Sequence, residues 1–146
     1  MNNLQIESYI SLYKAKVICA DELPAFLQKR PAAYVVNTDR CGLPGIHWTV
    51  FYFPRKGNVC ELFDSLGQTP EHYHNRFRQV LMANGPKYRY VKHRLQALDS
   101  DVCGQYCMYY IVQRCSGRTM VDICNDFFID KHHLNDTFVS LFTNAL

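Results

Sequence analysis

Two short apolar segments separated by a turn limit the fold more than any other part of the chain. IHWTVFYF (46–53) and VCELFDS (59–65) are rich in the aromatic and β-branched residues that favour strands. Between them, PRKGN (54–58) supplies the proline and glycine typical of a turn. The pattern predicts an antiparallel hairpin in which His47 and Asp64 lie roughly opposite each other.

A second constraint is CGQYCMYYIVQRC (103–115), which is apolar on nearly all sides and predicts a helix buried in the core. AAYVVNT (32–38) and KYRYVKH (87–93) predict two further strands. Apolar residues at helical spacing predict four amphipathic helices around them, over residues 4–16, 70–83, 119–128 and 132–145. The sequence thus predicts an α+β fold, with a small mixed, largely antiparallel sheet packed against a central buried helix.

Length and composition favour a single domain. The chain has 146 residues, of which 48% are apolar and 20% are charged, and its formal charge is +3. This length suits one sizeable core, so we expect one domain over residues 1–146. Charged residues interrupt the first twenty positions, which therefore do not predict a signal peptide, and no apolar run is long enough to span a bilayer. We expect a soluble monomer without membrane contact.

The cysteine pattern indicates a reducing environment. Seven cysteines occur, an odd number, with no CxxC pair among them. Disulfide-rich secreted domains usually have an even number of cysteines in a shorter chain. We therefore expect an intracellular, reducing compartment, which would also keep a catalytic thiol free.

Cys103 is the candidate nucleophile. It lies where a loop becomes the predicted buried helix, and amides at a helix N-terminus favour a thiolate. Gly104 follows at once, so the space beside the sulfur is expected to hold no side chain. Cys107 lies one turn further into the apolar run, where a cysteine is more often a small core residue.

His47 and Asp64 are the candidate base and its carboxylate partner. A thiol attacks a carbonyl carbon well only as thiolate, which requires a base within hydrogen-bond reach. His47 lies at the start of the first hairpin strand beside a loop rich in Gly and Pro, where its ring can face a cleft. The carboxylate can then bond one ring nitrogen while the other faces the thiol. The alternative is a core histidine, which is more common in an apolar strand.

Gln96 is the candidate donor to an oxyanion. It lies in the loop before the nucleophile helix, where its amide can join the Cys103 backbone N–H in binding the developing negative charge. Taken alone, it has the character of a surface glutamine. Gln105 is closer in sequence, but its place in the first helical turn directs it away from the sulfur.

Three segments together resemble the adenovirus-type cysteine peptidases, or adenains: GIHWTVFYFP (45–54), LFDSLG (62–67) and QALDSDVCGQYC (96–107). The wider relatives are the ubiquitin-like-protein-specific proteases that process SUMO. Shared features are the order His, acid, Gln, Cys, an aromatic residue directly after the histidine, and CG opening a central helix. The intervals of 17 residues from histidine to acid and seven from glutamine to cysteine are similar to the adenoviral pattern. The resemblance covers about residues 32–115.

This resemblance implies a papain-like or adenain-like architecture and a cysteine endopeptidase activity. It implies four catalytic residues: Cys103 as nucleophile, His47 as general base and acid, Asp64 as the group that orients the imidazole, and Gln96 in the oxyanion hole. It also implies a narrow groove, with the candidate residues Gly45, Trp48 and Gly104. Cleavage after small residues, often glycine, would follow. A viral or mobile-element origin is implied, with capsid or core precursor proteins as substrates, in the host nucleus or cytoplasm or in the virion.

Two features depart from the adenoviral enzymes. Their acid is usually glutamate, whereas Asp64 is similar to the SUMO-protease choice. They are also stimulated by DNA and by a peptide that is disulfide-linked in some, but this chain has no cysteine between Cys60 and Cys103, where that link is expected. We expect no required cofactor, and DNA or a peptide would be the activators that the resemblance implies.

The segment KYRYVKHR (87–94) combines basic side chains with two tyrosines. Such a surface can follow a nucleic-acid backbone, which makes Lys87, Arg89, Lys92 and Arg94 candidate DNA contacts. The alternative is an edge strand whose charges prevent aggregation, and the modest net charge favours it.

Three other functions fit parts of the sequence. Seven cysteines and six histidines allow a zinc-binding module, yet only Cys103 and Cys107 have the spacing of a ligand pair, so no metal site is predicted. A second alternative is an inactive relative that binds a peptide or a ubiquitin-like partner, although all four catalytic residue types are present. The third is an isopeptidase that acts on a ubiquitin-like protein.

Overall fold

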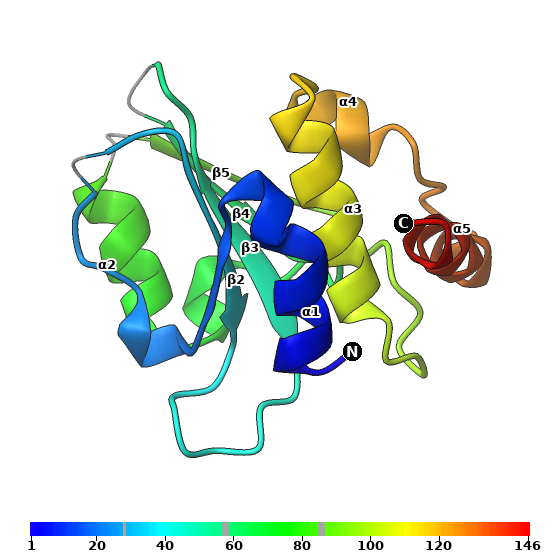
Figure 1. The fold of residues 1–146 in the computed structure, drawn as a ribbon, viewed down its shortest axis with the longest axis horizontal. Helices are drawn as coiled ribbons and strands as arrows, with labels where there is room; N and C mark the ends of the chain where they lie inside the picture. Colours follow the sequence, from blue (N-terminus) through cyan, green and yellow to red (C-terminus); the bar gives the residue numbers. More distant parts are fainter. Residues whose placement is uncertain (28, 57–58, 85–86) are drawn as a thin grey trace.

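A five-stranded sheet runs through the centre of the computed structural model, which describes residues 1–27, 29–56, 59–84 and 87–146 (Figure 1). In spatial order the strands are β1 (Lys16–Ile18), β2 (Ala32–Asn37), β3 (Trp48–Phe53), β4 (Val59–Phe63) and β5 (Lys87–Tyr90). The inner pairs, β2 with β3 and β3 with β4, are antiparallel. The outer pairs, β1 with β2 and β4 with β5, are parallel. The predicted α+β class with a mixed sheet is confirmed.

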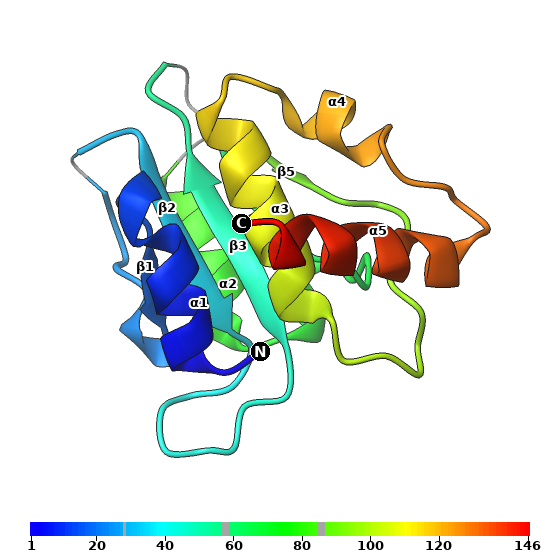
Figure 2. The same ribbon diagram turned by 45° about the vertical axis from the view of Figure 1, so that its right-hand side comes forward.

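Helices cover both faces of this sheet (Figures 1 and 2). On one face lie α1 (Asn3–Ile10) and α3 (Cys103–Cys115), and α5 (His132–Asn144) packs against α3. On the other face lies α2 (Asn75–Ala83). The remaining helical elements are short: α4 (Met120–Cys124) and the 3-10 turns η1 (Ser11–Tyr13), η2 (Ala20–Glu22) and η3 (Pro70–His72). Among the described residues, no helix combines the length and the apolar character needed to cross a membrane.

The sheet separates two hydrophobic cores, and this explains why the first hairpin strand is apolar throughout. Side chains alternate along a strand, so Val50 joins the core around α3 while Phe51 joins the core around α2. Both residues are fully buried, and Phe51 packs edge-on against Phe77 of α2 with ring centroids 4.8 Å apart. In α3 every residue from Tyr106 to Ile111 is buried, as the sequence predicted for a central helix.

The first predicted helix is shorter than its pattern suggested. It ends at Ile10, a single 3-10 turn follows, and Lys14 adopts a left-handed backbone conformation with φ of 55°. Lys16, the last residue of the predicted helix, instead begins β1, which pairs with β2. A strand of three residues carries little pattern of its own, so only its pairing with β2 determines it.

Other boundaries also differ from the predictions. The helix expected over 119–128 is restricted to α4, and the strand expected over 87–93 ends at Tyr90. Residues 57 and 58 of the predicted turn lie outside the described residues.

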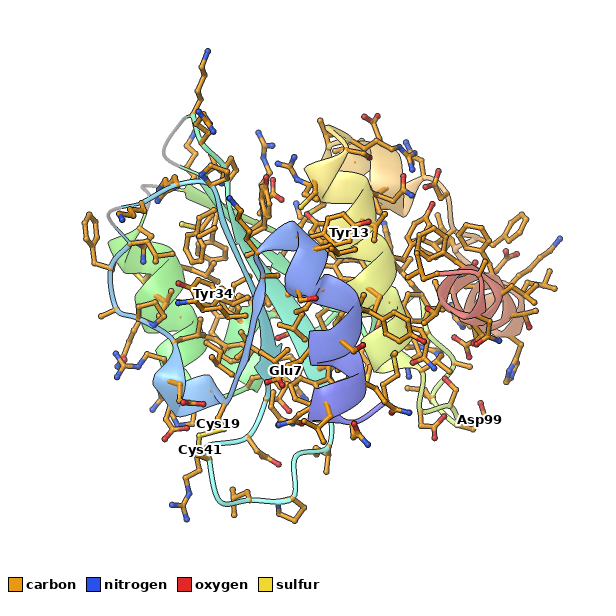
Figure 3. All side chains as sticks on the ribbon, viewed as in Figure 1. Glu7, Tyr13, Cys19, Tyr34, Cys41 and Asp99 are labelled. Atoms are coloured by element: carbon orange, nitrogen blue, oxygen red, sulfur yellow. A yellow bond between two sulfur atoms is a disulfide. The ribbon has the colours of Figure 1, made fainter. Side chains whose placement is uncertain are left out.

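Cys19 and Cys41 form a disulfide that the cysteine pattern did not predict (Figure 3). The bond links the segment after β1 to the loop between β2 and β3, which leads to His47. Five cysteines remain as free thiols: Cys60, Cys103, Cys107, Cys115 and Cys124. The reducing compartment stays a prediction, and one bond near the surface does not decide it.

Glu61 places a carboxylate in the middle of β4 with no exposure to solvent. Arg114 of α3 reaches it with two donors, Nε at 2.9 Å and Nη2 at 2.8 Å, and the Tyr110 hydroxyl donates at 2.6 Å. The guanidinium also lies over the Tyr52 ring, 4.4 Å from its centroid. These contacts fix the helix that carries Cys103 to the sheet that carries His47.

We expect Arg114→Ala to lower the free energy of unfolding by about 3 kcal/mol, because it leaves a buried carboxylate without its counter-charge. Urea denaturation followed by circular dichroism measures this loss. Arg118→Ala breaks the more exposed pair with Asp126 and serves as the control, with a smaller expected loss. Equal losses in the two variants would contradict the structural role of the buried pair.

Candidate active site

A cleft of about 940 Å³ opens at the end of the sheet where β3 begins and β4 ends. Its walls come from the loop before β3, the segment after β4 and the start of α3. His47, Gln96 and Cys103 all line it, and Asp64 lies behind His47 at 1% exposure. The structure therefore brings all four sequence-predicted residues to one place.

The hairpin register sets the distance between His47 and Asp64. Val50 pairs with Phe63 and Phe51 pairs with Leu62, and this register, continued by one residue, would place Asp64 opposite Thr49. His47 is thus the diagonal neighbour of Asp64 on the same face of the sheet, rather than directly opposite it. A diagonal pair suits a long side chain, and His47 Nε2 lies 2.5 Å from Asp64 Oδ1.

Four donors surround the Asp64 carboxylate. Oδ1 also accepts a hydrogen bond from the Leu66 backbone N–H at 2.9 Å. Oδ2 accepts from the Tyr73 hydroxyl at 2.6 Å and from the Gln68 backbone N–H at 3.2 Å. Burial by itself would raise the pKa of Asp64, but the hydrogen bond and charge of His47, together with the other donors, hold it below its usual value. Asp64 is therefore charged at neutral pH.

Cys103 and His47 are hydrogen-bonded inside the cleft. Burial opposes the charged form of both, yet hydrogen bonds to Asp64 and to Cys103 raise the pKa of His47 to about 9. The pKa of Cys103 is lowered, since its hydrogen bond to His47, the charge of that ring and the backbone N–H groups of Trp48 and Gly104 outweigh desolvation. Because Asp64 occupies Nε2, the nitrogen left for the sulfur is Nδ1. The contact therefore favours the thiolate form of Cys103 and the protonated form of His47.

Cys107 has the opposite character. It is 1% exposed in the core around α3, and burial raises the pKa of its thiol well above the ordinary value. An uncharged thiol that is closed to solvent is a poor nucleophile.

Gln96 lies 3% exposed in the wall of the cleft, and its amide orientation is defined by its neighbours. Its Nε2 donates to the Ser100 carbonyl at 3.1 Å and lies 3.2 Å from the Ser100 hydroxyl. A carbonyl cannot donate, so this end of the amide must be the NH₂ group. The other end, Oε1, accepts from the Ser65 hydroxyl at 2.7 Å, and the Ser65 carbonyl accepts the backbone N–H of Gln96 at 3.0 Å. Gln105 does not line the cleft.

Of the three predicted groove residues, Gly45 and Trp48 line the cleft and Gly104 follows Cys103, but their surroundings differ from expectation. The space that Gly104 leaves is taken by Met1, since a Cβ on Gly104 would lie 3.0 Å from the Met1 Cβ. Gly45 has φ of 71° and packs so closely on Asn37 that any side chain would clash. Trp48 is 8% exposed and contributes to both the cleft wall and the core.

The basic segment lies away from this cleft, on the edge strand β5 and the residues after it. Lys87 and Arg89 belong to β5, which fits the edge-strand interpretation. Lys92 lies over the Tyr90 ring, with Nζ 5.9 Å from its centroid. Arg94 donates from Nη1 to the Gln96 carbonyl at 2.9 Å, so this side chain supports the loop before α3. DNA binding by the segment stays a prediction.

Within the described part of the chain, Cys19, Glu22 and Cys41 bring three potential metal ligands together. Two of the three are the sulfurs of the disulfide. This group does not include the pair considered from the sequence, Cys103 and Cys107.

Two residues that contact the candidate site were not found from the sequence. The sequence pattern places Tyr73 on the apolar face of a helix and Ser65 at the end of a strand. Ser65 directly follows Asp64 just beyond the end of β4, and this adjacency to the predicted carboxylate was the signal that could have found it. Tyr73 has no comparable signal, because its position depends on the turn after β4.

A cysteine in contact with an imidazole that a buried carboxylate orients is the arrangement of cysteine peptidases. The fold agrees: the chain is similar to the crystal structure of ASFV pS273R protease, with a TM-score of 0.58 at 16% identity over 94% of this chain and 65% of that one. The crystal structure of the selenomethionine form of that protease also matches, with a TM-score of 0.46 at 24% identity over 76% of this chain and 44% of that one. This chain thus spans somewhat less than two thirds of that protease.

No known protein family matches the sequence, and neither does any individually curated protein. The structural likeness establishes a cysteine-protease fold of the kind found in this viral enzyme. Neither of these two matches is an adenain, so the adenovirus-type resemblance stays a prediction.

We expect iodoacetamide to alkylate Cys103 before the other free thiols near pH 7, because its pKa is lowered while that of Cys107 is raised. His47→Ala removes the imidazolium, so the pKa of Cys103 should rise and its alkylation should move to higher pH. If the pKa of Cys103 rises by about 1, its alkylation rate at pH values below that pKa falls about tenfold. Mass spectrometry of each cysteine across a pH series measures this. Faster reaction at Cys107 or Cys115, or no effect of His47→Ala, would contradict the ion pair.

Proposed function

We propose that this protein is a cysteine endopeptidase in which Cys103 is the nucleophile, His47 the general base and acid, and Asp64 the orienting carboxylate. The observation that carries the proposal is the line of contacts from Asp64 through His47 to Cys103 at the wall of an open cleft. The cysteine-protease fold supports it. If His47 were only a core residue, its ring would need neither the buried Asp64 carboxylate nor the Cys103 thiol as a partner.

The first chemical step follows from the ion pair. The Cys103 thiolate attacks the carbonyl carbon of the scissile bond and forms a carbon–sulfur bond, while the carbonyl electrons move to its oxygen. His47, protonated before the attack, donates its proton to the leaving amine as the carbon–nitrogen bond breaks. Water, deprotonated by the now neutral imidazole, then attacks the thioester carbon; the carbon–sulfur bond breaks, the carboxylic acid product leaves, and the thiolate and the protonated imidazole are regenerated.

Gln96 is proposed to stabilise the oxyanion of this reaction. Its NH₂ group carries two hydrogens, of which one is directed to the Ser100 carbonyl. The second is donated to the Ser100 hydroxyl, whose own hydrogen goes to the Ala97 carbonyl, and we propose that an oxyanion beside Cys103 replaces that hydroxyl as the acceptor. The backbone N–H of Cys103, at the start of α3, is the proposed second donor.

For the substrate, we propose precursor proteins cut after small residues, often glycine, as in the maturation of viral capsid or core proteins. This step rests on the resemblance to adenovirus-type peptidases, and the buried Trp48 and the Met1 side chain beside Gly104 support a restricted space near the thiol. An isopeptidase acting on a ubiquitin-like protein is the alternative, which the aspartate at position 64 favours. DNA and a peptide are proposed as activators only through the same resemblance.

We expect Cys103→Ala to lower the cleavage of glycine-containing precursor peptides by at least about 10³-fold without loss of the fold. Cys115→Ser removes an exposed thiol outside the cleft and should retain activity. Chromatography of peptide products, with a parallel set of ubiquitin-like fusions, gives the rates and distinguishes the two substrate classes. Full activity of the Cys103→Ala variant would end the proposal.

We expect Ser65→Ala to lower kcat by about tenfold, because it releases the carbonyl end of the Gln96 amide, whose other end is the proposed oxyanion donor. Alkylation by iodoacetamide forms no oxyanion, so the rate at Cys103 should stay as in the wild type. Comparing the rate of peptide hydrolysis with the rate of Cys103 alkylation separates a loss of the oxyanion donor from a loss of thiol reactivity. A variant that loses both in parallel would argue for a general disturbance of the cleft instead.

A further inference from the structure

The Tyr73 hydroxyl makes a contact that the proposed reaction does not require by itself. It donates to Asp64 Oδ2 at 2.6 Å, while Oδ1 of the same carboxylate lies 2.5 Å from His47 Nε2. One planar group thus joins the phenol on one oxygen to the imidazole on the other. The Tyr73 ring also lies beside the His47 ring, with centroids 6.0 Å apart and planes tilted by 32°.

We propose that Tyr73 is a positioning residue, which holds the Asp64 carboxylate in the orientation that directs His47 toward Cys103. A carboxylate can rotate about its bond to the side chain, and rotation would turn Oδ1 away from the imidazole. The two backbone donors, from Leu66 and Gln68, come from one short turn next to Asp64 itself. Tyr73 supplies the donor that is anchored elsewhere in the fold.

The anchoring of Tyr73 is independent of the reacting residues. It directly follows η3, and its backbone N–H donates to the Pro70 carbonyl at 3.3 Å. Its ring packs against Phe77 of α2 with centroids 5.7 Å apart, and Phe77 is fully buried in the core on that face of the sheet. The hydroxyl therefore approaches Asp64 from a fixed direction.

The Tyr73 hydroxyl also stays protonated, so it remains a hydrogen-bond donor. Burial and the neighbouring Asp64 charge raise the pKa of Tyr73, so the hydroxyl keeps its proton wherever Asp64 is charged. With a charged acceptor and a neutral donor, the hydrogen bond is of the charge-assisted kind, which is short and directional. A water molecule could solvate Oδ2, but it would not fix the plane of the carboxylate.

This inference rests on the proposed function only for its catalytic consequence, since the orientation of His47 can be measured without a substrate. The test compares wild-type protein with Tyr73→Phe, which keeps the ring and removes one oxygen atom. The matched control is Tyr109→Phe, because the Tyr109 hydroxyl, in the middle of α3 and outside the cleft, also donates to a carboxylate, Asp126 Oδ2 at 2.5 Å. Both variants lose one phenol–carboxylate hydrogen bond.

The main measurement is the rate of Cys103 alkylation by iodoacetamide against pH, resolved by mass spectrometry. A less well-oriented imidazolium stabilises the thiolate less, so the midpoint for Tyr73→Phe should rise by about one pH unit, which is a tenfold lower rate below the midpoint. Tyr109→Phe should give the wild-type midpoint. Other titratable or charged groups at the site are the same in all three proteins: Asp39, Arg40, His72, His74, Asp101 and Cys107.

A second measurement uses peptide hydrolysis. Tyr73→Phe should lower kcat by about tenfold with little change in KM, since the substrate still binds while the proton transfers are misdirected. Replacing Tyr73 by 4-aminophenylalanine, which keeps a donor at the same place, should restore the wild-type alkylation midpoint. This variant also serves if the phenylalanine variant proves too unstable to measure.

The outcomes are distinct. The alkylation midpoint of Cys103 in Tyr73→Phe could stay in place or move down, while thermal stability falls as it does in Tyr109→Phe. That result would overturn the positioning role, and the Tyr73 hydrogen bond would then be only structural. If wild-type protein cleaves no peptide or fusion, the proposed function fails while the alkylation series still decides the role of Tyr73. A raised midpoint in Tyr73→Phe alone supports the inference in either case.

Discussion

The candidate active site depends on keeping one carboxylate charged where water hardly reaches it. An isolated buried charge costs several kcal/mol, so Asp64 can remain ionised only if donors replace its lost solvation. The segment after β4 supplies them, because it turns at once and wraps around the end of its own strand. Gly67 allows this turn with φ of 68°, and it leaves no room for a side chain, since a Cβ there would lie 2.5 Å from the backbone of His93. The charge on Asp64 then determines that His47 is protonated.

The same reasoning explains how the pKa of Cys103 can be lowered although this residue is only 8% exposed. Desolvation alone would leave Cys103 as a neutral thiol, so the stabilisation has to be local and directed at the sulfur. It comes from the His47 ring and from two backbone N–H groups, those of Trp48 and Gly104. One of these amides belongs to the start of β3 and the other to the start of α3. The sulfur therefore lies where two elements begin, each with an unsatisfied donor to offer.

The hairpin, the buried helix and the positions of His47, Asp64 and Cys103 could be predicted because their signals are local and strong. The first hairpin strand is buried on both faces, so its apolar run is unambiguous, and hairpin pairing alone brings Asp64 near His47. The strand β1 and the disulfide between Cys19 and Cys41 could not be predicted, since each depends on a partner about 20 residues away in sequence. Tyr73 was missed for a similar reason. Its apolar ring fits a helical pattern, and nothing in that pattern indicates that its hydroxyl returns to the end of β4.

Asp64 and Ser65 show how one strand end can serve both sides of the cleft. Both residues follow the last residue of β4, where the chain begins to turn, and the carboxylate reaches His47 while the hydroxyl reaches Gln96. Because the two residues are adjacent, the length of chain between these two contacts is fixed. The long connection from Ser65 to Gln96 is less constrained, because it returns to a fixed point: the Ser65 carbonyl accepts the backbone N–H groups of Leu95 and Gln96 at 2.8 and 3.0 Å. The place of Gln96 relative to Asp64 is thus set by hydrogen bonds to Ser65 and not by the length of the chain between Ser65 and Gln96.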